Sequence, residues 1–114
     1  MTEDFSGFEK VCEISKLVEG RGEHFKIRDI DIALFKVNNK VYALNNICPH
    51  QHANIIHNGF IEDGYVICPA HGWGFNLKDG KMREYNSKLA SYKVKLHNGY
   101  VYVKVYGKKF NWNF

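Results

Sequence analysis

The sequence predicts an all-β fold, a sandwich or barrel of short antiparallel strands, and three observations support this. Short β-prone segments are separated by two-residue turn pairs, of which Asp63-Gly64, Asp79-Gly80 and Asn98-Gly99 are the strongest. Around the last pair, apolar and polar residues alternate, which is typical of an antiparallel sheet with one solvated face. Only one weak helix candidate is present, a single turn within residues 14–19.

These signals place the expected strands in chain order. An apolar, β-prone run from Ile32 to Val37 is followed by the turn pair Asn38-Asn39 and a second strand. In the last hairpin, Val101, Val103 and Val105 alternate with polar or aromatic residues and are expected to face the core. The expected strands cover residues 32–37, 40–44, 60–61, 65–67, 75–77, 81–83, 92–96 and 100–106.

The length of the chain predicts one domain, over residues 1–114. With 114 residues, of which 45% are hydrophobic and 15% aromatic, the chain can bury a core but cannot hold separate catalytic and cofactor domains. The polar, acidic first residues do not resemble a secretory signal, and no apolar run is long enough to span a bilayer. We therefore expect neither a membrane partner nor a membrane anchor. The aromatic tail, residues 110–114, is expected to pack back onto the body, with a role in docking as the alternative.

The net charge of +4 is unevenly distributed, because residues 72–114 hold nine basic and two acidic residues. The plain interpretation is a set of solvated lysines on strand faces. A sharper interpretation is a basic patch that steers an acidic protein partner toward the chain. Nucleic acid is not expected as a partner, because the chain has only three arginines, Arg21, Arg28 and Arg83, and no nucleic-acid-binding motif.

The three cysteines, Cys12, Cys48 and Cys68, argue against a disulfide framework. An odd count without a secretory signal favours a reducing compartment, and we expect a cytoplasmic location. Cys12 is expected on the first strand as a buried structural thiol.

Two short segments have the residues of a metal site. Cys48-Pro49-His50 and Cys68-Pro69-Ala70-His71 each supply one thiolate and one imidazole, and seventeen residues, 51 to 67, separate them. Each segment follows an expected strand, so two loop tips can bring their side chains to one point. The predicted metal ligands are Cys48, His50, Cys68 and His71.

The mixed composition of the two segments bears on the identity of the metal. A structural zinc finger usually pairs two cysteines on one arm, whereas here each arm combines a cysteine with a histidine. Mixed arms suit a centre with two metal atoms, one bound by both thiolates and the other by both imidazoles. A Rieske 2Fe–2S cluster has this ligation. A structural zinc ion without a redox role stays open as an alternative.

Around these ligands the sequence resembles the Rieske iron–sulfur domain. The resemblance covers most of the chain. It includes residues 41–46, which lead into the first segment, and His71-Gly72-Trp73, Phe75 and residues 79–81, which end and follow the second segment. It implies an antiparallel β-sandwich with a small cluster-binding subdomain of two loops, at about residues 45–75. It also implies one Rieske-type 2Fe–2S cluster per chain. Cys48 and Cys68 would bind the inner iron, and His50 and His71 would bind the outer iron near the surface.

Two departures from high-potential members of the family imply a low reduction potential. Ala53 and Ala70 stand where those members have cysteines that form a disulfide. Trp73 and Phe75 stand where they have a serine and a tyrosine hydroxyl beside the cluster sulfurs. With fewer hydrogen bonds to sulfur the reduced cluster is less stabilised, so we expect a potential of about −150 mV, at the low end of the Rieske range.

The other histidines are expected to be surface residues. His52 lies between the two motifs and could be an additional ligand, a docking residue or a proton-coupled group, but a loop-surface residue is the favoured interpretation. His24, His57 and His97 have no partner in the sequence pattern.

The resemblance implies a one-electron carrier rather than a stand-alone catalyst. The chain has no room for a mononuclear iron domain and no nucleotide-binding fingerprint. The expected partners are a flavin-dependent reductase and a terminal oxygenase or reductase. Alternatives are the small subunit of an assimilatory nitrite reductase, a structural zinc-binding module, and a redox or iron sensor. The sequence leaves the oligomeric state open.

Overall fold

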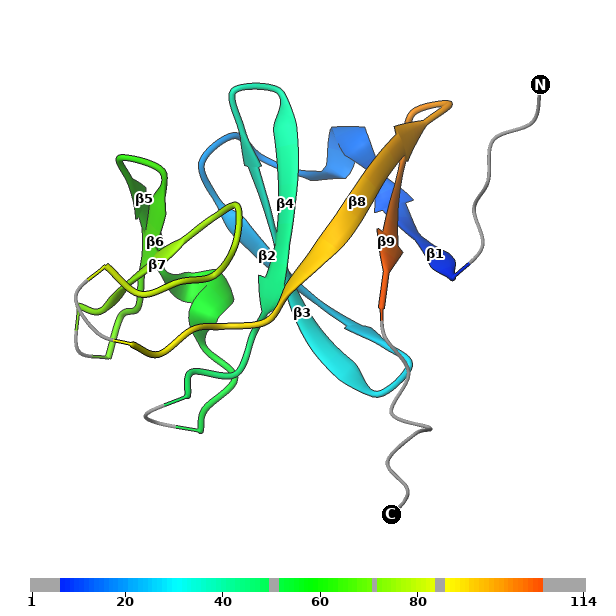
Figure 1. Cartoon of the computed structure of the whole chain (residues 1–114). Coiled ribbons are helices and arrows are strands. Elements are labelled where there is room, and N and C mark those ends of the chain that lie inside the picture. Colours follow the sequence, from blue (N-terminus) through cyan, green and yellow to red (C-terminus); the bar gives the residue numbers. More distant parts are fainter. Residues whose placement is uncertain (1–6, 50–51, 71, 84–85, 106–114) are drawn as a thin grey trace, which may run out of the picture.

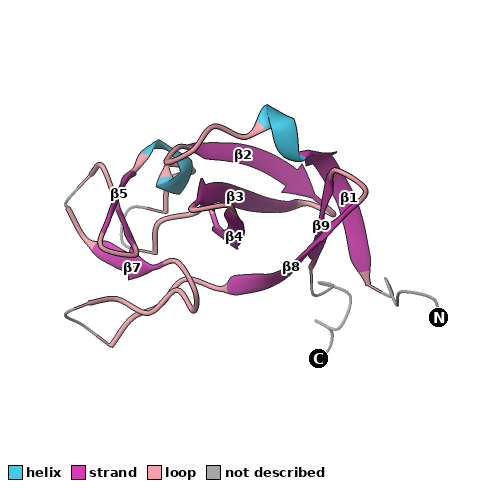
Figure 2. Cartoon of the chain, turned by 90° about the horizontal axis from the view of Figure 1, so that it is seen from above, coloured by secondary structure: helices cyan, strands magenta, loops and turns pink. Residues whose placement is uncertain are grey.

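A computed structural model describes residues 7–49, 52–70, 72–83 and 86–105. Apart from two short 3-10 turns, the regular elements of these residues are strands, arranged in two antiparallel sheets (Figures 1 and 2). The all-β prediction is confirmed. The elements are β1 (Phe8–Glu13), η1 (Ile14–Lys16), β2 (Gly22–Ile27), β3 (Ile30–Val37), β4 (Lys40–Asn45), η2 (Ile56–Asn58), β5 (Phe60–Glu62), β6 (Tyr65–Ile67), β7 (Gly74–Asn76), β8 (Ser91–His97) and β9 (Tyr100–Lys104).

The two sheets differ in size and lie at different ends of the molecule. The larger sheet has six strands in the order β1-β9-β8-β4-β3-β2, and the smaller has three in the order β5-β6-β7. In Figure 1 the small sheet lies on the left and β1 lies on the far right, and Figure 2 shows the same separation from above. No helix in the described part of the chain could span a bilayer.

The strand β3 is buried on both of its faces. Ile32 and Leu34 belong to one hydrophobic cluster, whereas Ala33 and Phe35 belong to the other, and all four side chains are 0% exposed. Because strand side chains alternate between faces, a strand covered on both sides reads as an uninterrupted apolar run. This explains the sequence from Ile32 to Phe35.

Each hydrophobic cluster fills one side of the large sheet. One cluster, which we call the loop-side core, includes Ala33, Phe35, Leu44, Cys48, Ile56, Val66, Cys68, Phe75, Leu77, Met82 and Leu89. The other, the far core, includes Leu17, Ile27, Ile32, Leu34, Val41, Ala43, Val101, Val103 and Val105. The prediction that Val101, Val103 and Val105 face inward is confirmed. The aromatic tail, residues 110–114, lies outside the described residues.

Three predicted turn pairs form tight hairpins. Asn38-Asn39, Asp63-Gly64 and Asn98-Gly99 all have positive φ at both residues, between 52° and 81°, as a type I′ turn requires. The β2–β3 hairpin uses Arg28-Asp29 in the same way, with φ of 51° and 66°. The sequence signals missed this turn because neither residue is a glycine or an asparagine.

The predicted hairpin at Asp79-Gly80 is wrong in its geometry. The strand β7 ends at Asn76, whose Oδ1 accepts a hydrogen bond from Lys78 N at 2.8 Å, and Gly80 N donates to Asn76 O at 2.7 Å. The two flanking segments still pair, because Phe75 bridges Met82, Asn76 N donates to Lys81 O at 2.8 Å and Arg83 N donates to Gly74 O at 3.1 Å. The turn is therefore longer than the predicted two residues.

The single helical turn expected within residues 14–19 is present as η1, a 3-10 turn over Ile14–Lys16. Leu17, at its C-terminal end, is 4% exposed and its backbone is extended. Packing of this side chain into the far core therefore ends the turn.

Candidate metal centre

Two loops bring Cys48 and Cys68 together inside the loop-side core. The first loop follows β4, and the second is the tip of the β6–β7 hairpin. Both cysteines are 2% exposed, and their Sγ atoms lie 3.7 Å apart. Half of the predicted ligand set thus converges on one point.

The distance between the two sulfur atoms fits a shared metal atom. A disulfide would place the sulfurs about 2.0 Å apart. Two thiolates at about 2.3 Å from one tetrahedral metal atom stand about 3.8 Å apart. The observed 3.7 Å agrees with the second arrangement. The cysteine pair therefore fits one metal atom of a cluster, and it fits a zinc ion equally well.

The first loop is folded by backbone hydrogen bonds around Cys48. Cys48 N donates to Ala53 O at 2.9 Å, and His52 N donates to Cys48 O at 2.7 Å. This tight closure places His52 in the left-handed region, with φ of 55°, and leaves its side chain exposed.

The second loop repeats this pattern around Cys68. Cys68 N donates to Trp73 O at 2.8 Å, and Gly72 N donates to Cys68 O at 2.9 Å, with a φ of 72° at Gly72. In both loops the cysteine N–H therefore reaches the carbonyl five residues later. The exposed His52 takes the place that a glycine has in the second loop.

The two predicted histidine ligands, His50 and His71, lie outside the described residues. For this reason no group of three or more candidate ligands occurs within the residues that are described. Of the described residues near them in the chain, His52, Ala70 and Gly72 are exposed, whereas Pro49 is half-buried. The assignment of the two imidazole ligands stays a prediction.

The surroundings of the cysteines are apolar. Ile56, Val66 and Phe75, all 0% exposed, belong to the same cluster as the two sulfurs, and Trp73 packs against it. Phe75, which stands where high-potential members of the family have a hydroxyl donor, presents a hydrocarbon ring. Water is therefore excluded on the inner side of the site.

Asn46 is a feature of the site that sequence patterns missed. It lies two residues before Cys48, is 0% exposed, and is the one buried polar residue within the described ranges. Its amide contacts Asn54 and His57. The available signal was a polar residue directly after the apolar strand β4, but turn asparagines are so common that this signal is weak.

Two histidines predicted to be isolated on the surface are instead close to each other. The ring centroids of His24 and His57 lie 5.4 Å apart, and His24 Nε2 lies 2.7 Å from Asp31 Oδ1. The hydrogen bond from His24, followed by one from Asn54, lowers the pKa of Asp31. Burial, and then the charge of His24, lower the pKa of His57. The surface interpretation is therefore wrong for the half-buried His57.

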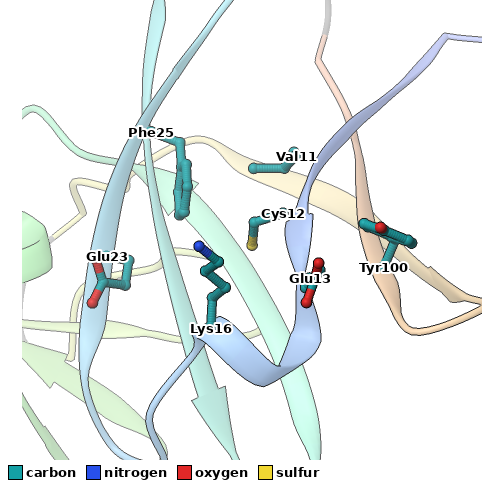
Figure 3. Close-up of a pocket in the computed structure, with 7 residues that line it drawn as sticks. All are labelled: Val11, Cys12, Glu13, Lys16, Glu23, Phe25 and Tyr100. Atoms are coloured by element: carbon teal, nitrogen blue, oxygen red, sulfur yellow. The ribbon is translucent and has the colours of Figure 1, made fainter.

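Cys12 lies far from the metal-binding loops, in a pocket between the edge strands β1 and β2 (Figure 3). The pocket has a volume of about 500 Å³, with walls from Val11, Phe25 and Tyr100. Cys12 is half-buried rather than fully buried as predicted, because the large sheet is open between its two edges. Burial, the largest cause, raises the pKa of its thiol, so thiolate chemistry is not favoured there.

Comparison with known proteins assigns the family. The family described as "Rieske-like [2Fe-2S] domain" matches residues 7–104. The ferredoxin component of the alkene monooxygenase system of Xanthobacter autotrophicus is 31% identical over 94 residues, which cover 82% of this chain and 77% of that protein.

Two solved structures show the same fold. A chain in the complex of reduced oxygenase and oxidized ferredoxin in carbazole 1,9a-dioxygenase has a TM-score of 0.76 and 26% identity, covering 86% of this chain and 93% of that chain. The small subunit of nitrite reductase [NAD(P)H] from Erwinia carotovora has a TM-score of 0.77 and 27% identity, covering 89% and 83%. Together with the converging cysteine pair, these matches show that the chain belongs to the Rieske-like [2Fe-2S] family and is an electron carrier with a Rieske 2Fe–2S cluster.

Proposed function

We propose that the chain is a stand-alone Rieske ferredoxin, a single domain over residues 1–114 that passes single electrons from a flavin-dependent reductase to a terminal oxygenase. In this proposal Cys48 and Cys68 bind the inner iron, and His50 and His71 bind the outer iron. The observation that supports it most directly is the buried cysteine pair, 3.7 Å apart, on two loops with the same hydrogen-bond pattern. The cluster supplies a centre that accepts and releases one electron.

The protein positions the cysteine ligands, shields the inner side of the cluster from water and leaves its outer side open to a partner. The backbone hydrogen bonds of Cys48 and Cys68 fold the two loops that carry the sulfurs. The apolar side chains behind them keep water away on the inner side, which is one way in which a protein sets a cluster's potential. The exposed residues beside His50 and His71 leave the outer side open to a partner. Electrons would therefore enter and leave at the loop tips.

The same comparison supports a proposal for the partner, and the cysteines support one for the location. One relative is named a ferredoxin component of a monooxygenase system, and one solved structure is a complex of an oxygenase with a ferredoxin. By analogy, an oxygenase surface is the proposed acceptor site. Within the described residues the three cysteines form no disulfide, which agrees with a reducing compartment, and we propose the cytoplasm.

A second candidate is the small subunit of a nitrite reductase, in which the partner is permanent. It is favoured by the similarity to the solved small subunit from Erwinia carotovora. The two candidates differ in the lifetime of the complex. A ferredoxin exchanges between a reductase and an oxygenase, whereas a subunit stays with one large chain.

Iron analysis and electron paramagnetic resonance test the proposal. The purified chain, reconstituted anaerobically and reduced with dithionite, should contain iron and sulfide and give a Rieske spectrum. His50→Ala and His71→Ala should each abolish that spectrum, whereas His97→Ala should not change it. A colourless protein that binds zinc and takes up no iron would support the structural zinc module and refute the electron-carrier proposal.

A further inference from the structure

The inference concerns Asn46, the buried polar residue at the start of the first metal-binding loop. A buried side-chain amide is costly unless its donors and its acceptor are all paired. Asn46 is 0% exposed and lies between the last residue of β4 and Cys48. An apolar side chain would avoid this cost, so the contacts that the amide makes indicate its purpose.

The backbone of Asn46 joins the two ends of the loop. Its N–H donates to Asp31 O at 2.8 Å, which ties the loop to the strand β3. Its carbonyl accepts hydrogen bonds from Ile55 N and Ile56 N, both at 3.1 Å. The segment that contains Cys48 therefore leaves and returns at the same residue.

The side chain of Asn46 closes the same loop a second time. Its Oδ1 accepts a hydrogen bond from His57 N at 2.6 Å, and its Nδ2 donates to Asn54 Oδ1 at 2.5 Å. The same Nδ2 lies 3.0 Å from His57 Nδ1. One amide thus contacts two residues on the far side of the loop.

This amide is one member of a closed ring of contacts among polar residues, and the ring ties it to the large sheet. Asp31 accepts from His24 at 2.7 Å and is also hydrogen-bonded to Asn54. The ring of His24 in turn lies against His57. The ring runs Asp31, Asn54, Asn46, His57, His24 and back to Asp31. The position of the amide is therefore set by β2 and β3 as well as by the loop.

We propose that Asn46 is a positioning residue for the metal centre. Its amide ties the start of the first loop to residues 54–57, and this tie holds Cys48 Sγ at the distance from Cys68 Sγ that one shared metal atom requires. The inference rests on the proposed function, in which Cys48 is a ligand. Asn46 itself contacts no metal atom and acts through Cys48 and His57.

The test compares Asn46→Ala with Asn58→Ala, a matched control in the same region that has an exposed side chain. In the metal-free full-length chain, Asn46→Ala should speed amide hydrogen exchange at Cys48, Ile55, Ile56 and His57. In the iron-loaded chain it should speed iron loss to a chelator about 10- to 100-fold, as is usual for residues that orient ligands. Asn58→Ala should match the unsubstituted chain in both measurements.

A purely structural role for Asn46 predicts a different result. Fewer molecules would then fold, but those that fold would keep the unsubstituted midpoint potential and spectrum. A positioning role predicts a shifted potential and altered g-values in the folded fraction. If Asn46→Ala fails to fold, Asn54→Ala is the second variant, because Asn54 is exposed and accepts one hydrogen bond from the Asn46 amide. It should change hydrogen exchange, iron loss and midpoint potential in the same direction but by less.

Two outcomes would overturn the inference. One is unchanged hydrogen exchange in the loop of a folded Asn46→Ala chain. The other is unchanged iron loss and potential in both the Asn46→Ala and the Asn54→Ala chains. If the unsubstituted chain binds no iron, the proposed function fails, but hydrogen exchange of the metal-free chain still tests whether Asn46 closes the loop.

Discussion

At the scale of single residues, the structure explains why similar side chains have different roles. His52 and Gly72 occupy equivalent places in two loops with the same hydrogen bonds, yet only the glycine adopts a positive φ without steric cost. Histidine tolerates this region better than β-branched residues do, but it is still strained. The exposed side chain of His52 agrees with the loop-surface interpretation.

We expect His52→Gly to leave the cluster intact and to leave stability unchanged or raise it by up to about 1.5 kcal/mol. Removing the left-handed strain gains about 1–2 kcal/mol, and the added freedom of glycine in the unfolded chain offsets about 0.5–1 kcal/mol. Denaturant unfolding and the Rieske spectrum measure both effects. Loss of iron from this variant would show that His52 is a ligand after all.

Phe75 offers a way to test the low potential of about −150 mV that we propose. Phe75→Tyr adds a hydroxyl donor in the loop-side core, where Phe75 is 0% exposed. If the hydroxyl reaches a cluster sulfur, it stabilises the reduced form, and the midpoint potential should rise. Phe60→Tyr, at an exposed position, is the control. A clearly positive potential in the unsubstituted chain would contradict the low-potential proposal.

At the scale of elements, local signals predicted some strands and missed others. The hairpin of β8 and β9 was predictable because Asn98-Gly99 and the alternating valines agree with each other. The strand β2 was missed because its turn, Arg28-Asp29, lacks the usual residues and its side chains are mostly half-buried. The contacts of Asn46 and the pairing of His24 with His57 could not be predicted, because they join residues brought together only by the folded sheet.

The outer face of the β8–β9 hairpin has a pair of lysines in direct register. Lys93 lies opposite Lys104, and like charges in this arrangement are destabilising. Lys93→Glu replaces repulsion with attraction and should stabilise the chain by about 0.2–1 kcal/mol at low salt. The gain should shrink in high salt because of screening. Lys78→Glu, in an exposed turn, is the control; an equal gain there would point to net charge instead of the pair.

The contact of η2 with β2 predicts a pH dependence of stability. Burial holds the pKa of His57 below its usual value, so the unfolded chain binds a proton more readily than the folded chain. The stabilising contribution is complete above about pH 6.5 and is lost as the pH falls toward the lowered pKa. His57→Gln should flatten this part of the stability profile in denaturant unfolding from pH 7 to pH 5. An unchanged slope would show that His57 is not responsible.

At the scale of the whole molecule, the metal-binding loops and the far core differ in what stabilises them. The cysteine loops are short, have exposed residues at His52, Ala70 and Gly72, and are held by a few backbone hydrogen bonds. The far core, by contrast, is closed by Val101 and Val103, both 0% exposed. The motif spacing predicted that the segments of Cys48 and Cys68 come together, whereas the two histidine ligands stay a prediction. The family resemblance gave no information on the contacts inside the far core.

Removing iron should therefore loosen the molecule unevenly. Because ligand binding contributes directly to the free energy of folding, the metal-free chain should melt at a lower temperature. Hydrogen exchange should rise most near Cys48 and Cys68 and least at Val101 and Val103. Uniform loosening of both regions would contradict this expectation and indicate that the metal stabilises the whole fold equally.

The double burial of β3 has a further consequence for dissecting the protein. A peptide cut to residues 45–75 would leave behind Ala33 and Phe35, which cover the inner side of the cysteine loops. A longer piece that kept β3 but lost β9 would expose Ile32 and Leu34 to solvent, and this apolar patch would promote aggregation. Because β3 contributes side chains to both hydrophobic clusters, neither the loop-side core nor the far core can be removed without exposing apolar residues of the other.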